Sequence, residues 1–160
     1  MQMQWSLRSG TQEDLPDLAK IEKESHAFPW KLEHFQKELE KPYSQLLILT
    51  DDETDSKIAG YIVFWMMFDE CEILNIVVDH PYRGKGLGKN MVRQAIKQAS
   101  QKGMKRTVLD VRKSNLNAVL LYQSCHFLIS HIRKNAYPDG EDAYHMTLSL
   151  EGEEVPSELI

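Results

Sequence analysis

Hydrophobic and polar positions follow two periods along the chain. Between residues 43 and 78, apolar runs of strand length are separated by short polar turns, and the acidic turn at 51–56 is typical of an antiparallel hairpin. Between residues 86 and 102, apolar residues recur at helical spacing, and Gly103 follows as a C-terminal cap. The pattern predicts strands at 3–8, 43–50, 58–68, 71–78, 107–111, 127–136 and 143–150, and helices at 11–25, 31–40, 86–102 and 117–124.

This order of elements predicts a mixed α/β fold, with one sheet and helices on both of its faces. The stretch at 73–78 is apolar on both faces, which is typical of a central strand covered on two sides. A chain of 160 residues and 18.6 kDa corresponds to about one domain. We therefore expect a single domain over residues 1–150 and an acidic, frayed tail at 151–160.

Composition excludes several classes of protein. The chain is 42% hydrophobic and 27% charged, which argues against a disordered chain, a collagen-like repeat or a coiled-coil rod. The N-terminal residues contain no apolar signal-peptide core, and the longest apolar run is about half the length of a membrane helix. We expect a cytoplasmic protein that does not bind a membrane. Cys71 and Cys125 are isolated, so neither a disulfide framework nor a metal site is predicted.

Positive charge is concentrated in one segment. The net charge is −5, yet residues 83–113 carry ten basic side chains and a single acidic one, Asp110. This asymmetry indicates one anion-binding site on an acidic protein, rather than the broad basic face of a protein that binds nucleic acid. A small ligand that carries phosphate fits the pattern better than DNA or RNA.

The basic segment begins with a glycine-rich turn between the central strand and the helix at 86–102. Its sequence is Arg83-Gly84-Lys85-Gly86-Leu87-Gly88-Lys89, which places consecutive backbone N–H groups at a helix N-terminus, where the helix dipole favours an anion. Lys89 stands at the third glycine of a dinucleotide fingerprint, and Arg83 and Asn90 break the pattern of a Walker loop. The turn therefore predicts a pyrophosphate site that is neither of these two.

The segment Arg83-Gly84-Lys85-Gly86-Leu87-Gly88 resembles the Gln/Arg-x-x-Gly-x-Gly/Ala loop of the GNAT acetyltransferases, and the similarity extends from Met3 to Leu150. Further segments resemble the RimI-type branch of N-terminal acetyltransferases: Phe28-Pro29-Trp30, 75–79, 111–118, Leu121-Tyr122 and 133–138. The resemblance implies the GNAT acyl-CoA N-acyltransferase fold, with a mostly antiparallel sheet of about seven strands. It also implies acetyl-CoA as cosubstrate, without a metal.

The resemblance also implies roles for individual residues. The implied cofactor contacts are Ile76, Val77, Val78, Arg83, Gly84, Lys85, Gly86, Leu87, Gly88, Lys89, Asn115 and Tyr122. Tyr122 matches the tyrosine that protonates the departing thiolate, and Asp110 stands where the branch has a glutamate that acts as general base, with Glu72 in reserve. The implied peptide contacts are Phe28, Trp30, Asn75, Tyr137 and Glu141.

The implied reaction is transfer of acetyl to the N-terminal alanine of a small-subunit ribosomal protein, by a monomeric enzyme. Two alternatives stay open: a GNAT enzyme that acetylates lysines or small amines, and a non-catalytic acyl-CoA sensor. Three departures from the branch bear on these alternatives. Asp110 is one methylene shorter than glutamate, His126 replaces a glycine at a helix end, and Ala136 replaces a tyrosine of the peptide pocket.

Overall fold

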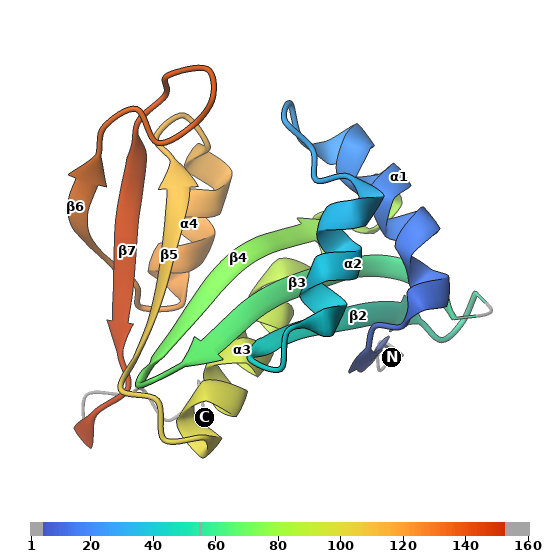
Figure 1. The fold of residues 1–160 in the computed structure, drawn as a ribbon, viewed down its shortest axis with the longest axis horizontal. Helices are drawn as coiled ribbons and strands as arrows, with labels where there is room; N and C mark the ends of the chain where they lie inside the picture. The colour runs from blue at the N-terminus through green and yellow to red at the C-terminus, as the bar shows by residue number, and fades with distance from the viewer. Residues whose placement is uncertain (1–4, 55, 153–160) are drawn as a thin grey trace. The chain divides into compact units, whose positions relative to one another are not determined.

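The computed structural model describes residues 5–54 and 56–152, whose helices and strands follow the predicted order (Figure 1). The elements are β1 (Trp5–Ser9), the 3-10 turn η1 (Gln12–Asp14), α1 (Leu15–Ser25), α2 (Leu32–Glu40), β2 (Ser44–Asp51), β3 (Lys57–Met67), β4 (Glu70–Val78), the 3-10 turn η2 (His80–Tyr82), α3 (Leu87–Gln101), β5 (Arg106–Arg112), α4 (Leu116–Ser124), β6 (Leu128–Arg133) and β7 (Ala143–Ser149). The start of the predicted strand at 3–8 and most of the predicted tail lie outside the described residues.

The seven strands form one sheet in the order β1-β2-β3-β4-β5-β7-β6. β1 pairs with β2, and β7 pairs with β5 and β6, in antiparallel fashion, whereas β4 and β5 run parallel. This topology confirms the mixed α/β fold with a mostly antiparallel sheet, and it confirms the central place of the strand at 71–78.

The described residues pack as two compact units. The first contains the described residues up to Phe64 together with Asn75–Met91, and the second contains Trp65–Leu74 together with the described residues from Val92 onward. The single domain over residues 1–150 stays a prediction. Among the described helices, none is long and apolar enough to cross a membrane.

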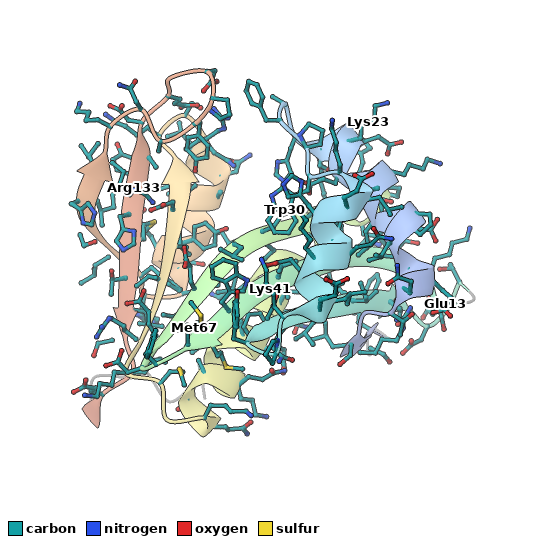
Figure 2. The ribbon with its side chains drawn as sticks, viewed as in Figure 1. Glu13, Lys23, Trp30, Lys41, Met67 and Arg133 are labelled. Atoms are coloured by element: carbon teal, nitrogen blue, oxygen red, sulfur yellow. The ribbon has the colours of Figure 1, made fainter. Side chains whose placement is uncertain are left out.

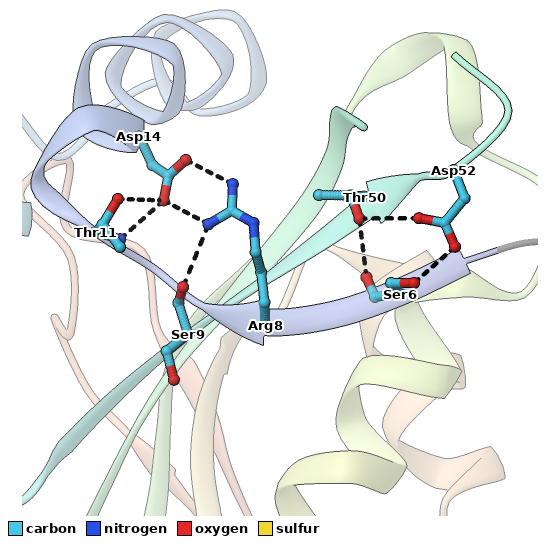
Figure 3. Close-up of polar contacts among 7 residues, drawn as sticks. All are labelled: Ser6, Arg8, Ser9, Thr11, Asp14, Thr50 and Asp52. Carbon is cyan, nitrogen blue, oxygen red and sulfur yellow. Dashed lines mark hydrogen bonds and ion pairs between the residues drawn. The ribbon is translucent and has the colours of Figure 1, made fainter. Parts of the chain in front are cut away.

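In the first unit, a bidentate ion pair fixes the start of α1 (Figure 3). The two terminal guanidinium nitrogens of Arg8 donate to the Asp14 carboxylate at 2.7 Å, and the Thr11 backbone N–H donates to the same carboxylate at 2.8 Å. Asp14 thus acts as the acidic member of the predicted capping box. Arg8, as the main hydrogen-bond donor, holds the pKa of Asp14 below its ordinary value.

The core of the first unit lies where α1 and α2 pack beside each other and α2 contacts β2 (Figure 1). Leu15 and Leu18 of α1 and Phe35 of α2 are fully buried, as the helical spacing of apolar residues predicts. The Phe35 ring meets the Tyr61 ring edge-to-face, with 5.7 Å between centroids. Burial of this apolar surface stabilises the unit and fixes α1 and α2 on the strands.

The second unit is built on β5 and β7, with α4 beside β5 (Figure 1). Val108 and Met146, on these two strands, are buried, and Phe127 fills the space beside α4. Both cysteines belong to this core: Cys71 and Cys125 are thiols with no exposed surface. Burial is the main cause that raises the pKa of Cys71 to about 12.

β6 ends earlier than predicted, at Arg133. Asn135 adopts a left-handed backbone conformation with φ of 51°, which asparagine tolerates better than most residues. Its N–H donates to the Asp142 carboxylate at 3.1 Å, and the Lys134 ammonium binds the same carboxylate at 3.1 Å. These contacts turn the chain out of the sheet before Ala136, so the predicted end of this strand at 136 is wrong.

The end of α4 forms a regular cap although it lacks the expected glycine. His126 has a φ of 70°, and its N–H donates to the Gln123 carbonyl at 2.9 Å. The Phe127 N–H donates to the Tyr122 carbonyl at 3.0 Å, which completes a Schellman motif. Histidine therefore occupies a position at which a side chain is strained.

We expect His126→Gly to raise the free energy of unfolding by about 1 kcal/mol, because glycine adopts this backbone conformation without strain. Urea unfolding followed by circular dichroism measures the difference. His126→Ala keeps a Cβ at the same position and should give no such gain. Equal stabilities of the glycine and alanine variants would show that the left-handed conformation carries no strain.

Candidate active site

The glycine-rich turn begins at the end of β4 in the first unit. The Asp79 N–H donates to the Ala59 carbonyl at 2.8 Å, and the Asp79 carboxylate accepts the His80 N–H at 2.9 Å, which starts η2. Gly84 and Gly86 then adopt φ values of 80° and 76°, with no atom within 4 Å of the place where a Cβ would stand. Backbone conformation, and not lack of space, therefore requires glycine here.

The turn leads directly into α3, which begins at Leu87. The first N–H groups of a helix have no partner within it and carry the positive end of the helix dipole. An open glycine turn before such groups can hold a pyrophosphate through backbone donors. Leu87 itself is buried, so its side chain belongs to the core and only its backbone can serve a ligand.

Two basic side chains of the turn bind the protein itself. The Arg83 Nε donates to the Val78 carbonyl at 2.9 Å, and its Nη2 donates to the Ser25 hydroxyl at 3.4 Å. The Lys85 ammonium lies 5.8 Å from the centroid of the Trp5 ring. Arg83 thus ties the turn to β4 and to the end of α1, which makes it a residue that shapes the turn.

The end of β4 leaves the ladder that it forms with β5. The register covers Glu70 to Ile73 on β4, whereas the strand continues to Val78. Val77 is buried, and its carbonyl oxygen lies 2.5 Å from the place where a Cβ on Gly60 would stand. Glycine at position 60 is therefore required for the close approach of β3 to the end of β4.

A buried carboxylate holds the segment between α1 and α2 near this strand. Glu22 is 1% exposed and accepts three hydrogen bonds, from the Tyr61 hydroxyl at 2.8 Å, the Asn75 side-chain amide at 2.9 Å and the Trp30 backbone N–H at 2.9 Å. Figure 2 labels Trp30. Glu22 was not predicted from the sequence, although an acidic residue at an inward position of the α1 stripe was a usable signal.

Of the three predicted peptide contacts in the first unit, two therefore take part in this network, and the third, Phe28, precedes Trp30 by two residues in the chain. Asn75 and Trp30 are held by Glu22, while the Phe28 side chain is 49% exposed. The Trp30 ring lies 5.4 Å from the Phe35 ring, between centroids, which anchors it to the core of the first unit. This part of the first unit thus combines an exposed apolar side chain with a buried polar network.

In the second unit, Tyr122 projects from α4 into the core. Its side chain is buried, and its ring meets the Phe127 ring edge-to-face with 6.0 Å between centroids. Burial is the main cause that raises the pKa of Tyr122, so the phenol keeps its proton at neutral pH. The Asn115 Oδ1 accepts the Ala118 N–H at 3.3 Å and caps α4, which leaves the other end of that amide to contact a ligand.

Asp110 is bonded through both carboxylate oxygens. Its Oδ1 lies 2.8 Å from the His145 Nδ1, and its Oδ2 accepts a hydrogen bond from the Arg133 guanidinium. Figure 2 labels Arg133 on β6. Glu72 lies on β4 opposite Val108, and burial followed by the negative charge of Asp110 raises its pKa. The two predicted carboxylates thus interact electrostatically.

A loop of the second unit holds the remaining predicted peptide contacts. The Arg112 guanidinium lies over the Tyr137 ring, 4.1 Å from its centroid, and donates to the Glu141 Oε1 at 2.9 Å. The Glu141 Oε2 accepts the Ser114 N–H at 2.8 Å, and these hydrogen bonds lower the pKa of Glu141. Glu141 therefore braces the loop, while burial and the Asp110 charge raise the pKa of Tyr137.

The raised pKa of Glu72 predicts a pH-dependent cost in stability. The folded state binds this proton more tightly than the unfolded state, so stability falls as the pH rises from about 4.3 through the folded pKa. We expect Glu72→Gln to raise the melting temperature at pH 7.5 and to give no gain at pH 4, by scanning calorimetry. Glu70→Gln removes an ion pair with Arg106 and should give no gain at either pH.

Comparison with known proteins identifies the family. The model of the acetyltransferase (GNAT) family matches residues 15–127. The chain belongs to this family. A relative of this GNAT chain from Bacillus subtilis is 36% identical over 152 residues, with 94% of this chain and 99% of the relative covered. The ribosomal protein bS18-alanine N-acetyltransferase of Salmonella typhimurium is 34% identical over 140 residues, with 86% and 92% covered.

Solved structures share the fold of this GNAT chain. The crystal structure of the ribosomal-protein-S18-alanine N-acetyltransferase from Escherichia coli is 33% identical, with a TM-score of 0.84 over 96% of this chain and 99% of that one. A chain of the NatC complex bound to Gag peptide and CoA is 20% identical, with a TM-score of 0.83 over 93% of this chain and 100% of that one. The latter similarity concerns the fold alone.

The predicted site residues of this GNAT chain fall into two groups, one in each unit. The first unit holds Phe28, Trp30, Asn75, Ile76, Val77, Val78 and residues 83–89, and the second holds Glu72, Asp110, Asn115, Tyr122, Tyr137 and Glu141. His145 and Arg133 were missed, because the register of β5, β6 and β7 brings them to Asp110 and no local motif marks them. No cluster of metal-ligating side chains occurs among the described residues.

Proposed function

We propose that this GNAT chain transfers the acetyl group of acetyl-CoA to the N-terminal α-amine of a protein, with the N-terminal alanine of a small-subunit ribosomal protein as its substrate. The observation that carries the proposal is the glycine turn, in which Gly84 and Gly86 open onto the N-terminus of α3. Relatives at 34% identity that are named bS18-alanine N-acetyltransferases support the choice of substrate. We place the reaction in the cytoplasm and expect a monomer.

The first unit would hold the cosubstrate. The backbone N–H groups of residues 84–89 would bind the pyrophosphate, because they combine an open turn with the positive end of a helix dipole. Residues 76–78, beyond the ladder with β5, would align the pantetheine arm and polarise the thioester oxygen through their backbone. The side chains of Phe28, Trp30 and Asn75 would line the path of the peptide.

The second unit would supply the proton transfers, with Asn115 as a further cofactor contact. The amine nitrogen forms a bond to the acetyl carbon while the carbon–sulfur bond breaks, and one proton must leave the amine and one must reach the sulfur. Tyr122 would donate its phenolic proton to the thiolate, since a phenol has an ordinary pKa of about 10 and is protonated at neutral pH. The carboxylate pair of Asp110 and Glu72 would receive the amine proton, and Tyr137 and Glu141 would border the peptide.

An N-terminal amine suits this site better than a lysine. A peptide α-amine has a pKa near 8 and is about a tenth neutral at pH 7, whereas lysine with a pKa near 10.4 is about 0.04% neutral. The difference corresponds to about 3.3 kcal/mol of the barrier. Both carboxylate oxygens of Asp110 are already bonded to His145 and Arg133. A substrate amine with a low pKa, which loses its proton readily, is therefore favoured.

The test measures release of CoA thiol from acetyl-CoA with two peptides. One begins Ala-Arg with a free N-terminus, and the other has the same sequence with a blocked N-terminus and one internal lysine. Turnover with the first peptide alone is expected. Equal turnover with the blocked peptide would move the assignment to lysine acetylation, and acetyl-CoA binding without turnover would favour a sensor or a different amine.

A further inference from the structure

A row of three side chains crosses the strands of the second unit. Asp110 of β5 is the register partner of His145 on β7, and His145 is the partner of His131 on β6. The His145 Nδ1 lies 2.8 Å from the Asp110 Oδ1, and the two imidazole rings stack with 4.6 Å between centroids. Since register partners share one face of a sheet, the row is a property of the β-ladder.

The row fixes which nitrogen of His145 carries the proton. An ionised carboxylate can only accept hydrogen bonds, and the Asp110 Oδ2 already accepts one from Arg133. The His145 Nδ1 must therefore donate to Oδ1, so the lone pair of a neutral ring lies on Nε2. The side chains of Asp110 and His145 are 23% and 24% exposed, which leaves this pair open to a reactant.

Charged and titratable groups lie near His145 on the neighbouring strands β5 and β6 and, one strand further, on β4. Asp110 lies on β5, Arg133 and His131 on β6, and Glu72 on β4, where its pKa is influenced by the charges of Asp110, His145 and Arg133. Burial and the charge of Asp110 raise the pKa of Tyr137, and the charge of Arg133 lowers it. Asp110 and Glu72 thus bring carboxyl groups to this part of the sheet, and Arg133 brings a positive charge.

We propose that His145 accepts the proton of the acceptor amine through Nε2, with Asp110 as the residue that positions its ring. This inference rests on the proposed acetyl transfer and changes one step of it, because it makes His145 the direct proton acceptor in place of the carboxylate pair of Asp110 and Glu72. The amine proton moves to Nε2, His145 becomes an imidazolium bonded to Asp110, and solvent removes the proton after the peptide leaves.

The inference also accounts for the aspartate at position 110. An aspartate is shorter than a glutamate by one carbon–carbon bond, about 1.5 Å. A group displaced by that much can lose about 10²-fold in rate. The imidazole of His145 extends the reach of Asp110, because its second nitrogen lies on the far side of the ring from the carboxylate.

The experiment compares kcat/KM for the free Ala-Arg peptide between pH 5.5 and 9 in the unaltered enzyme, His145→Gln, Asp110→Asn and His131→Gln. Imidazole changes its charge between about pH 5 and 8, so a plot of kcat/KM against pH for the unaltered enzyme should have a rising limb in this range. This limb adds to the rise that deprotonation of the peptide amine causes. His145→Gln and Asp110→Asn should lose this limb and about 10²-fold of kcat/KM at pH 7. His131→Gln, which removes a histidine of the row without touching Asp110, should keep the limb and change kcat/KM less than about threefold.

Two further measurements separate chemistry from folding. The affinity for acetyl-CoA and the melting temperature of His145→Gln should stay close to those of the unaltered enzyme, because the side chain is partly exposed. Imidazole nitrogen NMR should report the proton of neutral His145 on Nδ1, and Asp110→Asn should move it to Nε2.

The outcomes distinguish this inference from the function on which it rests. Unchanged kcat/KM and an unchanged pH profile in His145→Gln would overturn the role of His145 and leave acetyl transfer standing. A lower kcat/KM with the limb retained would make His145 a purely structural residue. An unaltered enzyme that binds acetyl-CoA but acetylates no N-terminal peptide would overturn the proposed function, and the role of His145 with it.

Discussion

Tyr122→Phe is expected to lower kcat for acetyl transfer by about 10²- to 10³-fold, because a positioned general acid contributes about 10²–10⁴-fold. The ring of Tyr122 is buried against Phe127, and phenylalanine fills the same space. The affinity for acetyl-CoA and the free energy of unfolding should therefore change by less than about 1 kcal/mol. Steady-state kinetics with the free Ala-Arg peptide, alongside equilibrium binding of acetyl-CoA, measures both quantities.

Tyr144→Phe provides a matched control for this substitution. Tyr144 lies on β7 in the same unit, with the Lys113 ammonium 5.6 Å from the centroid of its ring. Its hydroxyl has no part in the proposed proton transfers, so kcat should stay within about twofold. If Tyr122→Phe and Tyr144→Phe turned over equally well, the sulfur would take its proton from another group or from water.

Glu22→Ala is expected to lower the free energy of unfolding by about 3 kcal/mol. The change leaves the Tyr61 hydroxyl, the Asn75 amide and the Trp30 N–H without their acceptor, and a buried unsatisfied donor costs about 1–3 kcal/mol. Water that enters the space left by the side chain can bind these donors and offsets part of the lost stability. Urea unfolding followed by tryptophan fluorescence measures the loss.

Two variants test the origin of this effect. Glu22→Gln keeps one acceptor oxygen and should lose about 1–2 kcal/mol, because its amide nitrogen cannot accept from the remaining donors. Glu24→Ala removes an exposed carboxylate from the same helix and should change stability by less than about 0.5 kcal/mol. A loss below about 1 kcal/mol in Glu22→Ala would mean that the network contributes little to the fold.

Much of the fold could be predicted from sequence because its signals are local. Three elements lie within a few residues of their predicted bounds: the strands at 44–51 and 57–67 and the helix at 87–101. Their signals are the hydrophobic period and the turn residues, which can be recognised within a short stretch of consecutive residues. The glycine turn is local in the same sense, and Gly84 and Gly86 adopt the positive φ that makes them necessary.

The features that could not be predicted depend on residues far apart in the chain. Asp110 and His145 meet only because β5 and β7 pair in one particular register, and a shift by one residue would place them on opposite faces. Arg83 could be identified as a basic residue of the turn, but its hydrogen bond to the Val78 carbonyl depends on how the turn folds back. The Schellman cap at His126 shows that backbone hydrogen bonds can hold a strained residue that local preference disfavours.

The buried thiols give the protein a built-in reporter. Because Cys71 and Cys125 have no exposed surface, and burial raises the pKa of Cys71 to about 12, a thiol reagent added during an assay should react with released CoA and spare the folded chain. When substrates are left out, the same reagent should label these cysteines only as the second unit opens. The labelling rate then measures how often the second unit, which contains Tyr122 and His145, opens locally, and it can be measured in the same buffer as the reaction.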